Sequence, residues 1–316
     1  MSVKLKSALL IGATVTALVG CGNPSDNKTQ APAGEKSGGE RSLVIATEAA
    51  YPPFNNMTAD GKIVGFDVEV INAVCAEMKA QCKVIAQDWD GLIPGLLTNK
   101  YDAVIAGMSI TPERLQQVDF SEPYFANTMI WLAKNDGSFD PSNIKGLVLG
   151  SQRGTTGAKY ISERYDNKDG NRVQLYDTYT NAYLDMKAGR NQAVMAEKVS
   201  ASDWLKENGE GFGLIGEEID NNDNLGIAVR KGDSLKDDFN KALHALKQSG
   251  KLAELEQATF GANTPAQSPA QEAPKADAQA ETAKTEAKAD TAKADNADTI
   301  KADQADKAET TKSETK

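Results

Sequence analysis

Residues 103–114 read Ala-Val-Ile-Ala-Gly-Met-Ser-Ile-Thr-Pro-Glu-Arg, an apolar run that is followed at once by a polar loop. Short β-rich runs like this one recur along the chain, with helical patterns between them. The other runs are residues 43–47, 84–86, 146–149, 193–195 and 226–229. This alternation is typical of βαβ units, so the sequence predicts an α/β protein built on a mostly parallel sheet.

Two stretches have the spacing of an amphipathic helix. In the first, apolar residues recur behind Asp67, which we expect to cap the helix. These residues are Val68, Ile71, Val74, Cys75 and Met78. The second helical face runs through Leu235, Phe239, Leu243, Leu246 and Leu252. Parallel sheets bind ligands at the carboxyl ends of their strands, so the loops that lead into the helices are where a site is expected.

Composition excludes several classes of function. The chain has 316 residues, with 35 Lys and Arg against 45 Asp and Glu and a formal net charge of −10 at pH 7. That balance argues against a nucleic-acid partner. Three Cys and one His are too few for a Cys₄ or Cys₂His₂ zinc site, and the single His244 has no nucleophile near it in sequence. We therefore expect neither a metal nor a cofactor.

The N-terminus is typical of an exported protein. Lys4 and Lys6 precede an apolar stretch, residues 8–19, that is too short to span a bilayer and that matches a signal peptide over residues 1–20. The run Leu18-Val19-Gly20-Cys21 resembles a bacterial lipobox. We expect Cys21 to become the acylated first residue of the mature protein, so that lipid tethers it to a membrane. The alternative is an ordinary cleaved signal with a stray cysteine.

Two low-complexity segments flank the globular part. Residues 21–42 are polar and rich in Gly, Ser and Lys, which predicts a flexible tether. Residues 264–316 are a tail of Ala, Lys, Asp, Glu and Thr in which Ile300 is the only large apolar residue, so we expect it to be disordered. The globular part therefore extends over residues 43–263.

Cys75 and Cys82 are seven positions apart in a chain whose signal sends it to an oxidising compartment. A disulfide is the economical interpretation, and it would stabilise the fold by roughly 2 to 3 kcal/mol in the chain-entropy model. Two buried free thiols are the alternative. A redox role is disfavoured because the spacing is not Cys-x-x-Cys.

The loops after the strands carry the groups of an amino-acid site. Arg114 offers a fork that suits a carboxylate, and Ser109 and Thr155 can add donors beside it. Glu197 has the charge that an α-ammonium group requires. The remaining candidates would contact the side chain of the amino-acid ligand. Tyr51 and Trp89 offer flat surfaces for it, and Glu48 together with Trp89 would suit a cationic group at its end. Singly, each of these residues is more often a surface, cap or core residue.

Residues 43–263 resemble the polar amino-acid branch of bacterial extracellular solute-binding proteins, which supply ABC importers, and especially the arginine-binding and lysine/arginine/ornithine-binding members. Five stretches carry the resemblance: Ala-Thr-Glu-Ala-Ala-Tyr-Pro-Pro-Phe at 46–54, Gly-Phe-Asp-Val at 65–68, Gly-Leu-Ile-Pro-Gly-Leu at 91–96, Ala-Gly-Met-Ser-Ile-Thr-Pro-Glu-Arg at 106–114 and Ala-Gly-Arg at 188–190. The Cys75–Cys82 loop also looks like the disulfide loop of the basic amino-acid binders.

The resemblance implies a two-lobed periplasmic-binding-protein-like α/β fold with hinge crossover strands and a cleft between the lobes. Lobe one would be residues 43–127 plus 230–263, and lobe two residues 128–229. By matching position, Arg114 would bind the α-carboxylate with Ser109 and Thr155, and Gly107 would offer main chain. Glu197 would bind the α-ammonium, and Glu48, Tyr51 and Trp89 would contact the side chain of the ligand.

The implied partners are a free L-amino acid, preferably basic and most of all arginine, and the permease subunits that recognise the closed lobes. We expect a monomer at the periplasmic or cell-surface face of a bacterial membrane. Glutamine is the nearest alternative ligand, since Ala106-Gly107 permits it. Gln152-Arg153 would repel a cation if the Arg153 side chain pointed inward. A dehydratase-type enzyme or a surface adhesin on the same fold are the alternatives of other classes.

Overall fold

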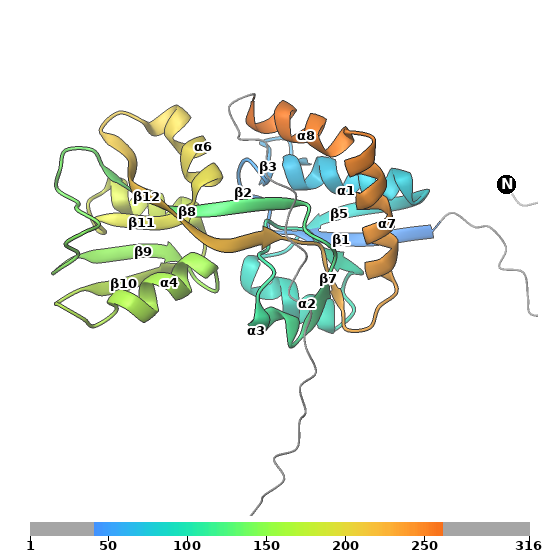
Figure 1. Cartoon of the computed structure of the whole chain (residues 1–316), viewed down its shortest axis with the longest axis horizontal. Coiled ribbons are helices and arrows are strands. Elements are labelled where there is room, and N and C mark those ends of the chain that lie inside the picture. The colour runs from blue at the N-terminus through green and yellow to red at the C-terminus, as the bar shows by residue number, and fades with distance from the viewer. Residues whose placement is uncertain (1–40, 262–316) are drawn as a thin grey trace, which may run out of the picture. The chain divides into compact units, whose positions relative to one another are not determined.

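The computed structural model describes residues 41–261, in which the strands form two five-stranded sheets and a small three-stranded one (Figure 1). The first sheet has the order β5-β1-β6-β13-β7. Its strands are β1 (Arg41–Thr47), β5 (Ala80–Ala86), β6 (Ala103–Val104), β7 (Val118–Phe120) and β13 (Ala228–Arg230). β1 is parallel to β5 and β6, whereas β13 is antiparallel to its neighbours. The parallel strands are those that the sequence pattern predicts, and β13 and β7 make the sheet mixed.

The second sheet has the order β10-β9-β11-β8-β12. Its strands are β8 (Phe125–Lys134), β9 (Val148–Gln152), β10 (Arg172–Tyr176), β11 (Ala193–Glu197) and β12 (Phe212–Leu225). β9 is parallel to β10 and β11, and β8 is antiparallel to β11 and β12. β8 follows the first sheet along the chain and β12 leads back to it, so these two long strands are the crossovers (Figure 1). We call the part built on the first sheet the first lobe and the part built on the second sheet the second lobe.

Alternating side chains on β1 enter different hydrophobic clusters. Leu43 and Ile45 pack with α1 (Phe66–Glu77), α7 (Leu235–Gln248) and α8 (Lys251–Phe260). Val44 and Ala46 pack in a separate cluster with α2 (Leu92–Leu97). Because successive strand residues point to opposite faces, both faces of the first sheet are covered.

The second sheet is covered in the same way, by α4 (Thr156–Tyr165), α5 (Tyr179–Lys187) and α6 (Lys198–Asn208). All five residues of β11 are buried. Val194 and Ala196 pack in the cluster that contains α5 residues, whereas Ala193 and Met195 pack with Ile161 of α4. A central strand buried on both faces is expected to be apolar throughout, as Ala-Val-Met-Ala is.

Two expectations about helices are wrong. Asp67 does not cap α1: the N-cap is Gly65, at φ 122°, and a Cβ there would lie 2.4 Å from the carbonyl oxygen of Phe54. Asp67 is instead fully buried and accepts hydrogen bonds from Asn55 (2.8 Å) and Tyr124 (2.6 Å). The second helical face is also not one helix, because Gly250 at φ 76° separates α7 from α8. Glycine takes this left-handed conformation without steric cost, so the chain turns there.

A cluster of four phenylalanines joins segments that are far apart in the sequence. The rings of Phe54, Phe66, Phe125 and Phe260 contact one another with centroids 4.9 to 6.2 Å apart. Phe260, the last residue of α8, thereby packs against the start of β8. Beside this cluster, the sulfurs of Cys75 on α1 and Cys82 on β5 form a disulfide, with Cα atoms 6.2 Å apart.

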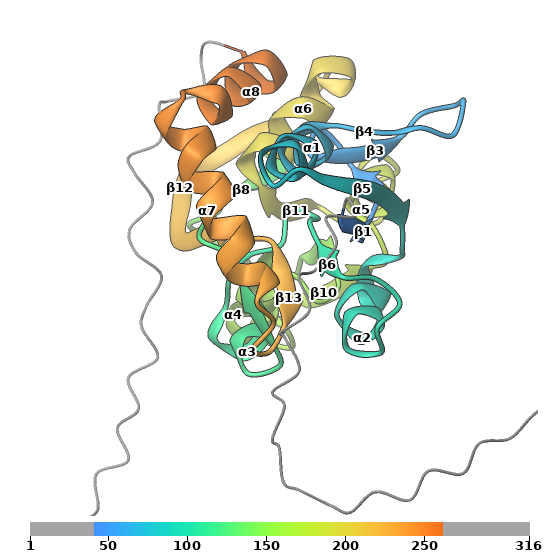
Figure 2. The same ribbon diagram turned by 90° about the vertical axis from the view of Figure 1, so that its right-hand side faces the viewer.

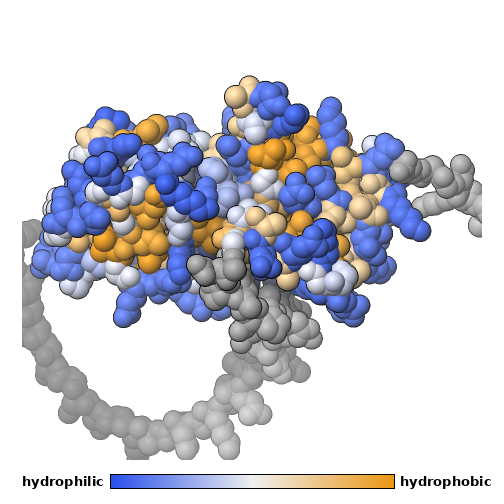
Figure 3. Space-filling model, turned by 90° about the horizontal axis from the view of Figure 1, so that it is seen from above, coloured by the Kyte–Doolittle hydropathy of each residue, from blue (hydrophilic) through white to orange (hydrophobic). Residues whose placement is uncertain are grey.

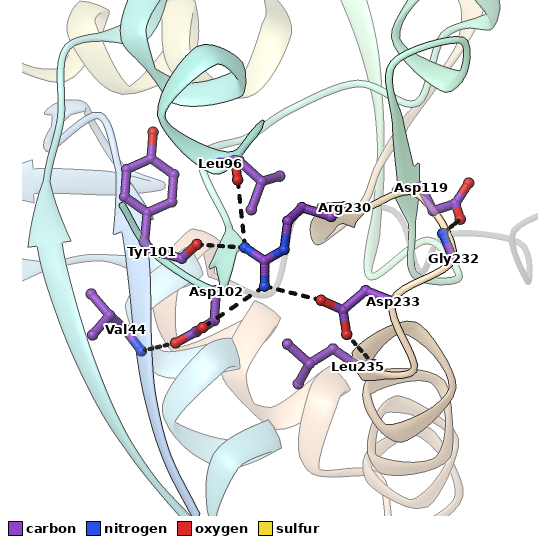
Figure 4. A network of polar contacts seen from close by, with 9 residues as sticks. All are labelled: Val44, Leu96, Tyr101, Asp102, Asp119, Arg230, Gly232, Asp233 and Leu235. Carbon is purple, nitrogen blue, oxygen red and sulfur yellow. Dashed lines mark hydrogen bonds and ion pairs between the residues drawn. The ribbon is translucent and has the colours of Figure 1, made fainter. Parts of the chain in front are cut away.

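Arg230, the last residue of β13, joins that strand to neighbouring segments of the first lobe (Figure 4). Its Nη1 donates to the carbonyl oxygen of Tyr101 at 2.8 Å, and its Nη2 lies 3.0 Å from Asp233 and 3.8 Å from Asp102. Asp102 in turn accepts a 2.8 Å hydrogen bond from the amide of Val44 on β1. The network fixes the point at which the second crossover re-enters the first lobe.

The small sheet is an antiparallel hairpin arrangement of β2 (Ala50–Tyr51), β3 (Asn55–Met57) and β4 (Ile63–Val64), and its β3–β4 turn projects from the first lobe (Figure 2). Figure 3 shows hydrophobic residues in patches among hydrophilic ones on the face seen from above. Within residues 41–261, no helix has both the length and the apolar character needed to cross a membrane.

Several expectations concern residues outside the described range. They are the signal peptide at 1–20, the lipid on Cys21, most of the tether and the tail at 264–316. Arg41 and Ser42, which we assigned to the tether, already belong to β1. The lobe boundaries stay a prediction, although β13 begins at Ala228 and pairs within the first sheet, slightly before the expected boundary.

Candidate functional site

The candidate residues lie on loops and strand ends of both lobes. In the first lobe, Glu48 follows β1, Trp89 begins the short 3₁₀ helix η1 (Trp89–Gly91), and Ser109 precedes α3 (Pro112–Leu115). In the second lobe, Thr155 follows β9 and Glu197 ends β11. Carboxyl ends of parallel strands meet at one edge of a sheet, so each lobe presents its candidates together. Hydrogen bonds between the two sets, described below, join them across the lobes.

Arg114 is held rigidly in a buried position. Thr111 caps α3 by accepting from the Arg114 amide at 3.2 Å, so the helix starts where the side chain is needed. The guanidinium donates from Nη1 to the carbonyl oxygen of Ser109 at 2.6 Å and from Nη2 to that of Gly154 at 3.0 Å. Its Cζ lies 5.3 Å from the centroid of the Trp89 ring. Burial lowers the pKa of Arg114 from its ordinary value, and the nearby carboxylates, Asp223 first, raise it.

The start of α4 adds donors for the same anion. Thr155 is the N-cap, and its hydroxyl accepts from the Ala158 amide at 3.1 Å and donates to the Gln152 carbonyl at 2.7 Å. The free N–H groups of a helix N-terminus favour negative charge. The Arg114 guanidinium reaches the loop before α4 through its hydrogen bond to the Gly154 carbonyl oxygen. Together they form a site that suits a carboxylate.

Glu197 supplies the opposite charge and is only 4% exposed. Its Oε2 accepts a 2.9 Å hydrogen bond from the hydroxyl of Tyr51, which belongs to the first lobe. Burial raises the pKa of Glu197, while the Tyr51 and Tyr179 hydroxyls and the Arg114 guanidinium lower it. A buried carboxylate of this kind gains most from a cationic group placed next to it.

Glu48 is a second buried carboxylate, 8% exposed. It accepts a 2.7 Å hydrogen bond from Gln152 Nε2, so this contact too joins the lobes. Burial raises the pKa of Glu48 to about 7; the Gln152 hydrogen bond lowers it, and the nearby Glu197, Asp88 and Asp90 raise it further. A cationic side chain in contact with Glu48 would keep it ionised. The described residues place none in contact with it, so burial prevails.

Aromatic rings and glycines shape the space between these groups. The Tyr51 ring is stacked on Phe54, with centroids 5.3 Å apart. Gly107, at φ 56°, allows this, because a Cβ there would lie 2.7 Å from Cε1 of Tyr51. A Cβ on Gly154 would similarly lie 3.2 Å from Nε1 of Trp89. The loop before α4 therefore sits directly on the Trp89 ring.

Arg153 lies at the rim. Its exposed guanidinium forms ion pairs with Asp90 of the first lobe, at 2.9 Å, and with Asp177 of the second. A second ion pair between the lobes joins Lys159 to Glu113. The repulsion that an inward-pointing Arg153 would exert on a cation is thus absent.

All eight predicted ligand residues belong to one connected set of contacts, but the sequence interpretation missed two members. In the sequence, Gln152 stands out only as the neighbour of Arg153, which gives no sign that its own side chain contacts Glu48. Asp223 on β12 is 3% exposed, and its carboxylate lies near the Ser109 hydroxyl and the Arg114 guanidinium. Burial and Glu197 raise the pKa of Asp223 to about 7, and the Ser109 hydroxyl and Arg114 lower it. Asp223 stands in a run of Asp and Asn, which carries no signal of burial.

Over residues 41–261 we find no group of His, Cys, Asp and Glu side chains that could hold a metal ion. The chemistry that the residues do offer is recognition: a carboxylate at Arg114 and α4, an ammonium group at Glu197, and a further polar or cationic group at Glu48. These three subsites match the α-carboxylate, the α-ammonium and the side chain of an amino acid.

Comparisons with known proteins identify the family and relatives of this chain. Residues 43–262 match the model of the bacterial extracellular solute-binding proteins, family 3. The L-arginine-binding protein of Pseudomonas aeruginosa is 40% identical over 230 residues, covering 70% of this chain and 88% of that protein. A Salmonella typhimurium periplasmic binding protein whose structure explains high arginine specificity is 38% identical, with a TM-score of 0.64 and coverage of 70% and 99%. An ancestral arginine-binding protein bound to glutamine is 36% identical, with a TM-score of 0.65 and coverage of 70% and 98%.

Proposed function

Because the chain belongs to the bacterial extracellular solute-binding proteins, family 3, we propose that it is the substrate-binding protein of an amino-acid ABC importer. Its substrate is a basic L-amino acid, arginine in the first place. The observation that carries the proposal is the position of Glu48, a buried carboxylate beside a site that already provides for an α-carboxylate and an α-ammonium group.

The charges of the site support a basic ligand. Arginine at neutral pH has one carboxylate and two cationic groups. Arg114 with the start of α4 complements the first, Glu197 complements the α-ammonium, and Glu48 complements the side chain. Glu48 and Glu197 then each receive a cationic group of the ligand, which offsets the cost of burying their charges.

Capture proceeds by closure of the lobes. Contacts from both lobes surround the site, as in Tyr51 to Glu197 and Gln152 to Glu48, so a ligand held between them favours the closed arrangement. The permease subunits then recognise that arrangement and receive the amino acid. Lipid on Cys21 keeps the protein at the outer side of the bacterial membrane and raises its concentration near the permease.

The same residues argue for a receptor rather than an enzyme. A raised carboxyl pKa in a buried site also fits a general acid or base. In this site, however, Glu48 and Glu197 each already accept a hydrogen bond from the opposite lobe, which orients them for binding. A dehydratase is therefore the weaker hypothesis, and incubation with candidate cyclic acids would expose it by product formation.

Glutamine is the second candidate ligand. A relative described as an arginine-binding protein has a structure with glutamine bound, and Glu48 can accept from a neutral amide as well as from a cation. Arginine would pair its cationic side chain with the charge of Glu48, whereas glutamine would only donate a neutral hydrogen bond to it.

Calorimetric titration tests the proposal. The soluble chain that begins after Cys21 is unfolded and refolded to remove carried-over ligand, then titrated with L-arginine, L-lysine, L-ornithine, L-histidine and L-glutamine. We expect one-to-one binding of arginine with a Kd of about 1 μM or tighter, roughly −8 kcal/mol. Tighter binding of glutamine would move the assignment to the second candidate, and no binding of any amino acid would refute the receptor proposal.

A further inference from the structure

Gln152 is the last residue of β9 and is only 2% exposed. Its Nε2 donates to two acceptors, the carboxylate Oε1 of Glu48 at 2.7 Å and the carbonyl oxygen of Asp177 at 2.9 Å. The residue directly precedes the loop through Gly154 that rests on Trp89. Gln152 therefore lies at the end of the site where the ligand side chain is expected.

The chemistry of these partners fixes the orientation of the amide. A peptide carbonyl is an acceptor only, so the amide nitrogen of Gln152 must face that of Asp177, and the same nitrogen donates to Glu48. The amide oxygen, Oε1, then faces the other way. The hydrogen bonds of Gln152 within residues 41–261 all run from Nε2, so Oε1 is left to accept from a ligand.

The hydrogen bond also determines which oxygen of Glu48 is available. Oε1 is occupied by Gln152, and no described residue donates to Oε2. A carboxylate oxygen and an amide oxygen from adjoining side chains thus form a pair of acceptors, held together by the 2.7 Å bond between the two groups.

We propose that Gln152 is a specificity-determining residue that selects a guanidinium group over a primary ammonium group at the side-chain end of the site. The inference rests on the proposed function and deepens it. Two N–H groups of a guanidinium, which lie in one plane, would donate to Glu48 Oε2 and Gln152 Oε1.

The physical basis is the difference between the two cations. A guanidinium is planar, presents several N–H groups in a fixed fork and is weakly hydrated, so a pair of neighbouring acceptors satisfies much of it. An ammonium group is compact and strongly hydrated and needs acceptors in three directions. Two acceptors cannot pair with all three N–H groups of an ammonium, so Gln152 contributes less binding free energy for lysine and ornithine than for arginine.

Gln152 also joins the lobes, and a purely structural role must be distinguished from selectivity. If the residue only stabilised closure, its removal would weaken every ligand by the same factor. If it accepts from the ligand, its removal weakens arginine more than lysine. The ratio of the two dissociation constants separates the roles, since closure contributes equally to both.

The experiment compares the wild type with Gln152→Met, which keeps the length of the side chain but has no strong acceptor. Arginine and lysine affinities are measured by calorimetry on refolded protein, and thermal melts show whether the variant is folded. We expect the arginine Kd to rise roughly tenfold or more, as for loss of a charge-assisted hydrogen bond, with lysine changed by less than about threefold.

The matched control is Arg153→Gln, the adjacent position, which removes an ion pair between the lobes at the exposed rim. It is expected to change both ligands by the same factor. Equal losses for arginine and lysine in Gln152→Met would overturn the inference while leaving the proposed function intact. Absence of arginine binding in the wild type would instead refute the proposed function.

A ligand-side measurement covers the case in which Gln152→Met does not fold. Asymmetric dimethyl-L-arginine keeps the positive charge but lacks both N–H donors of one terminal nitrogen. Binding to the wild type should be roughly tenfold or more weaker than that of arginine, because one of the paired acceptors is left unsatisfied. Equal affinity for the two ligands would contradict the role of Gln152.

Discussion

The hydroxyl of Tyr51 donates a 2.9 Å hydrogen bond to Oε2 of Glu197, a residue 146 positions away in the other lobe. Both side chains are buried, at 4% exposure each. The contact places the carboxylate assigned to the α-ammonium against the aromatic wall of the opposite lobe. We propose that ligand binding and lobe closure are coupled through this one oxygen.

Tyr51→Phe keeps the ring and removes the donor. A hydrogen bond to the ionised form lowers the pKa of a carboxyl, so the variant should raise the pKa of Glu197 further. We expect arginine to bind about tenfold more weakly at pH 7, as for loss of one hydrogen bond to a charged group. Calorimetry measures the change. Tyr165→Phe on α4, which lies outside the site, is the control and should bind arginine as the wild type does. Wild-type arginine affinity in Tyr51→Phe would contradict the coupling.

Arg114→Lys keeps the charge but loses the fork. The guanidinium makes two directed hydrogen bonds, to Ser109 and Gly154, that a single ammonium group cannot reproduce. We expect arginine affinity to fall by about a hundredfold and the melting temperature to fall by a few degrees, because a buried network is disturbed. The measurement is a titration paired with a melt. Retention of wild-type affinity would remove Arg114 from the carboxylate subsite.

Glu48→Gln replaces a carboxylate by a neutral amide of the same shape. Arginine should bind at least roughly tenfold more weakly, because the charge-assisted hydrogen bonds become neutral ones. Binding of glutamine should change little, since its side chain has no charge to complement. Asp60→Asn, at an exposed position of the β3–β4 turn, is the matched control for loss of one negative charge. An arginine affinity unaffected by Glu48→Gln would refute the charge argument.

The pH dependence of stability without ligand follows from the buried carboxyls. Burial raises the pKa of Glu48 and Asp223 to about 7 and that of Asp67 to about 6. Between pH 4.5 and 7 the native state thus binds more protons than the unfolded state at these groups, so they make stability fall as pH rises. We expect the ligand-free protein to melt at a lower temperature at pH 8 than at pH 5.

Arginine should reduce this loss, because the bound cations favour the ionised carboxylates. Melting curves at several pH values, with and without saturating arginine, measure both effects, and Glu48→Gln should show a smaller dependence than the wild type. A melting temperature that rises steadily from pH 5 to pH 8 without ligand would contradict the account of the buried carboxyls.

Much of the fold could be predicted from local patterns. Apolar runs gave the parallel strands except β10, and the polar loops after them gave the eight proposed ligand residues, because parallel strands bring their carboxyl ends together. Helix boundaries were harder to predict from the sequence. Asp67 has the composition of a cap but is buried against Tyr124, and Gly250 interrupts an apolar stripe that looks continuous.

The missed site residues depend on long-range contacts. Gln152 and Glu48 are 104 positions apart, and nothing near either residue in the sequence indicates that their side chains meet. Asp223 lies in an acidic, Asn-rich run that is typical of an exposed loop, yet it is buried on a crossover strand. Such contacts arise from the packing of one lobe against the other, which local periodicity does not encode.

The most direct test of the central claim, that Glu48 binds a cationic side chain, compares L-arginine with L-citrulline on the refolded wild type. Citrulline has nearly the same shape but a neutral urea group in place of the guanidinium. We expect citrulline to bind at least about a hundredfold more weakly, roughly 2.7 kcal/mol. Affinities within about threefold of each other would show that Glu48 does not recognise charge, and the assignment of a basic amino acid would fail.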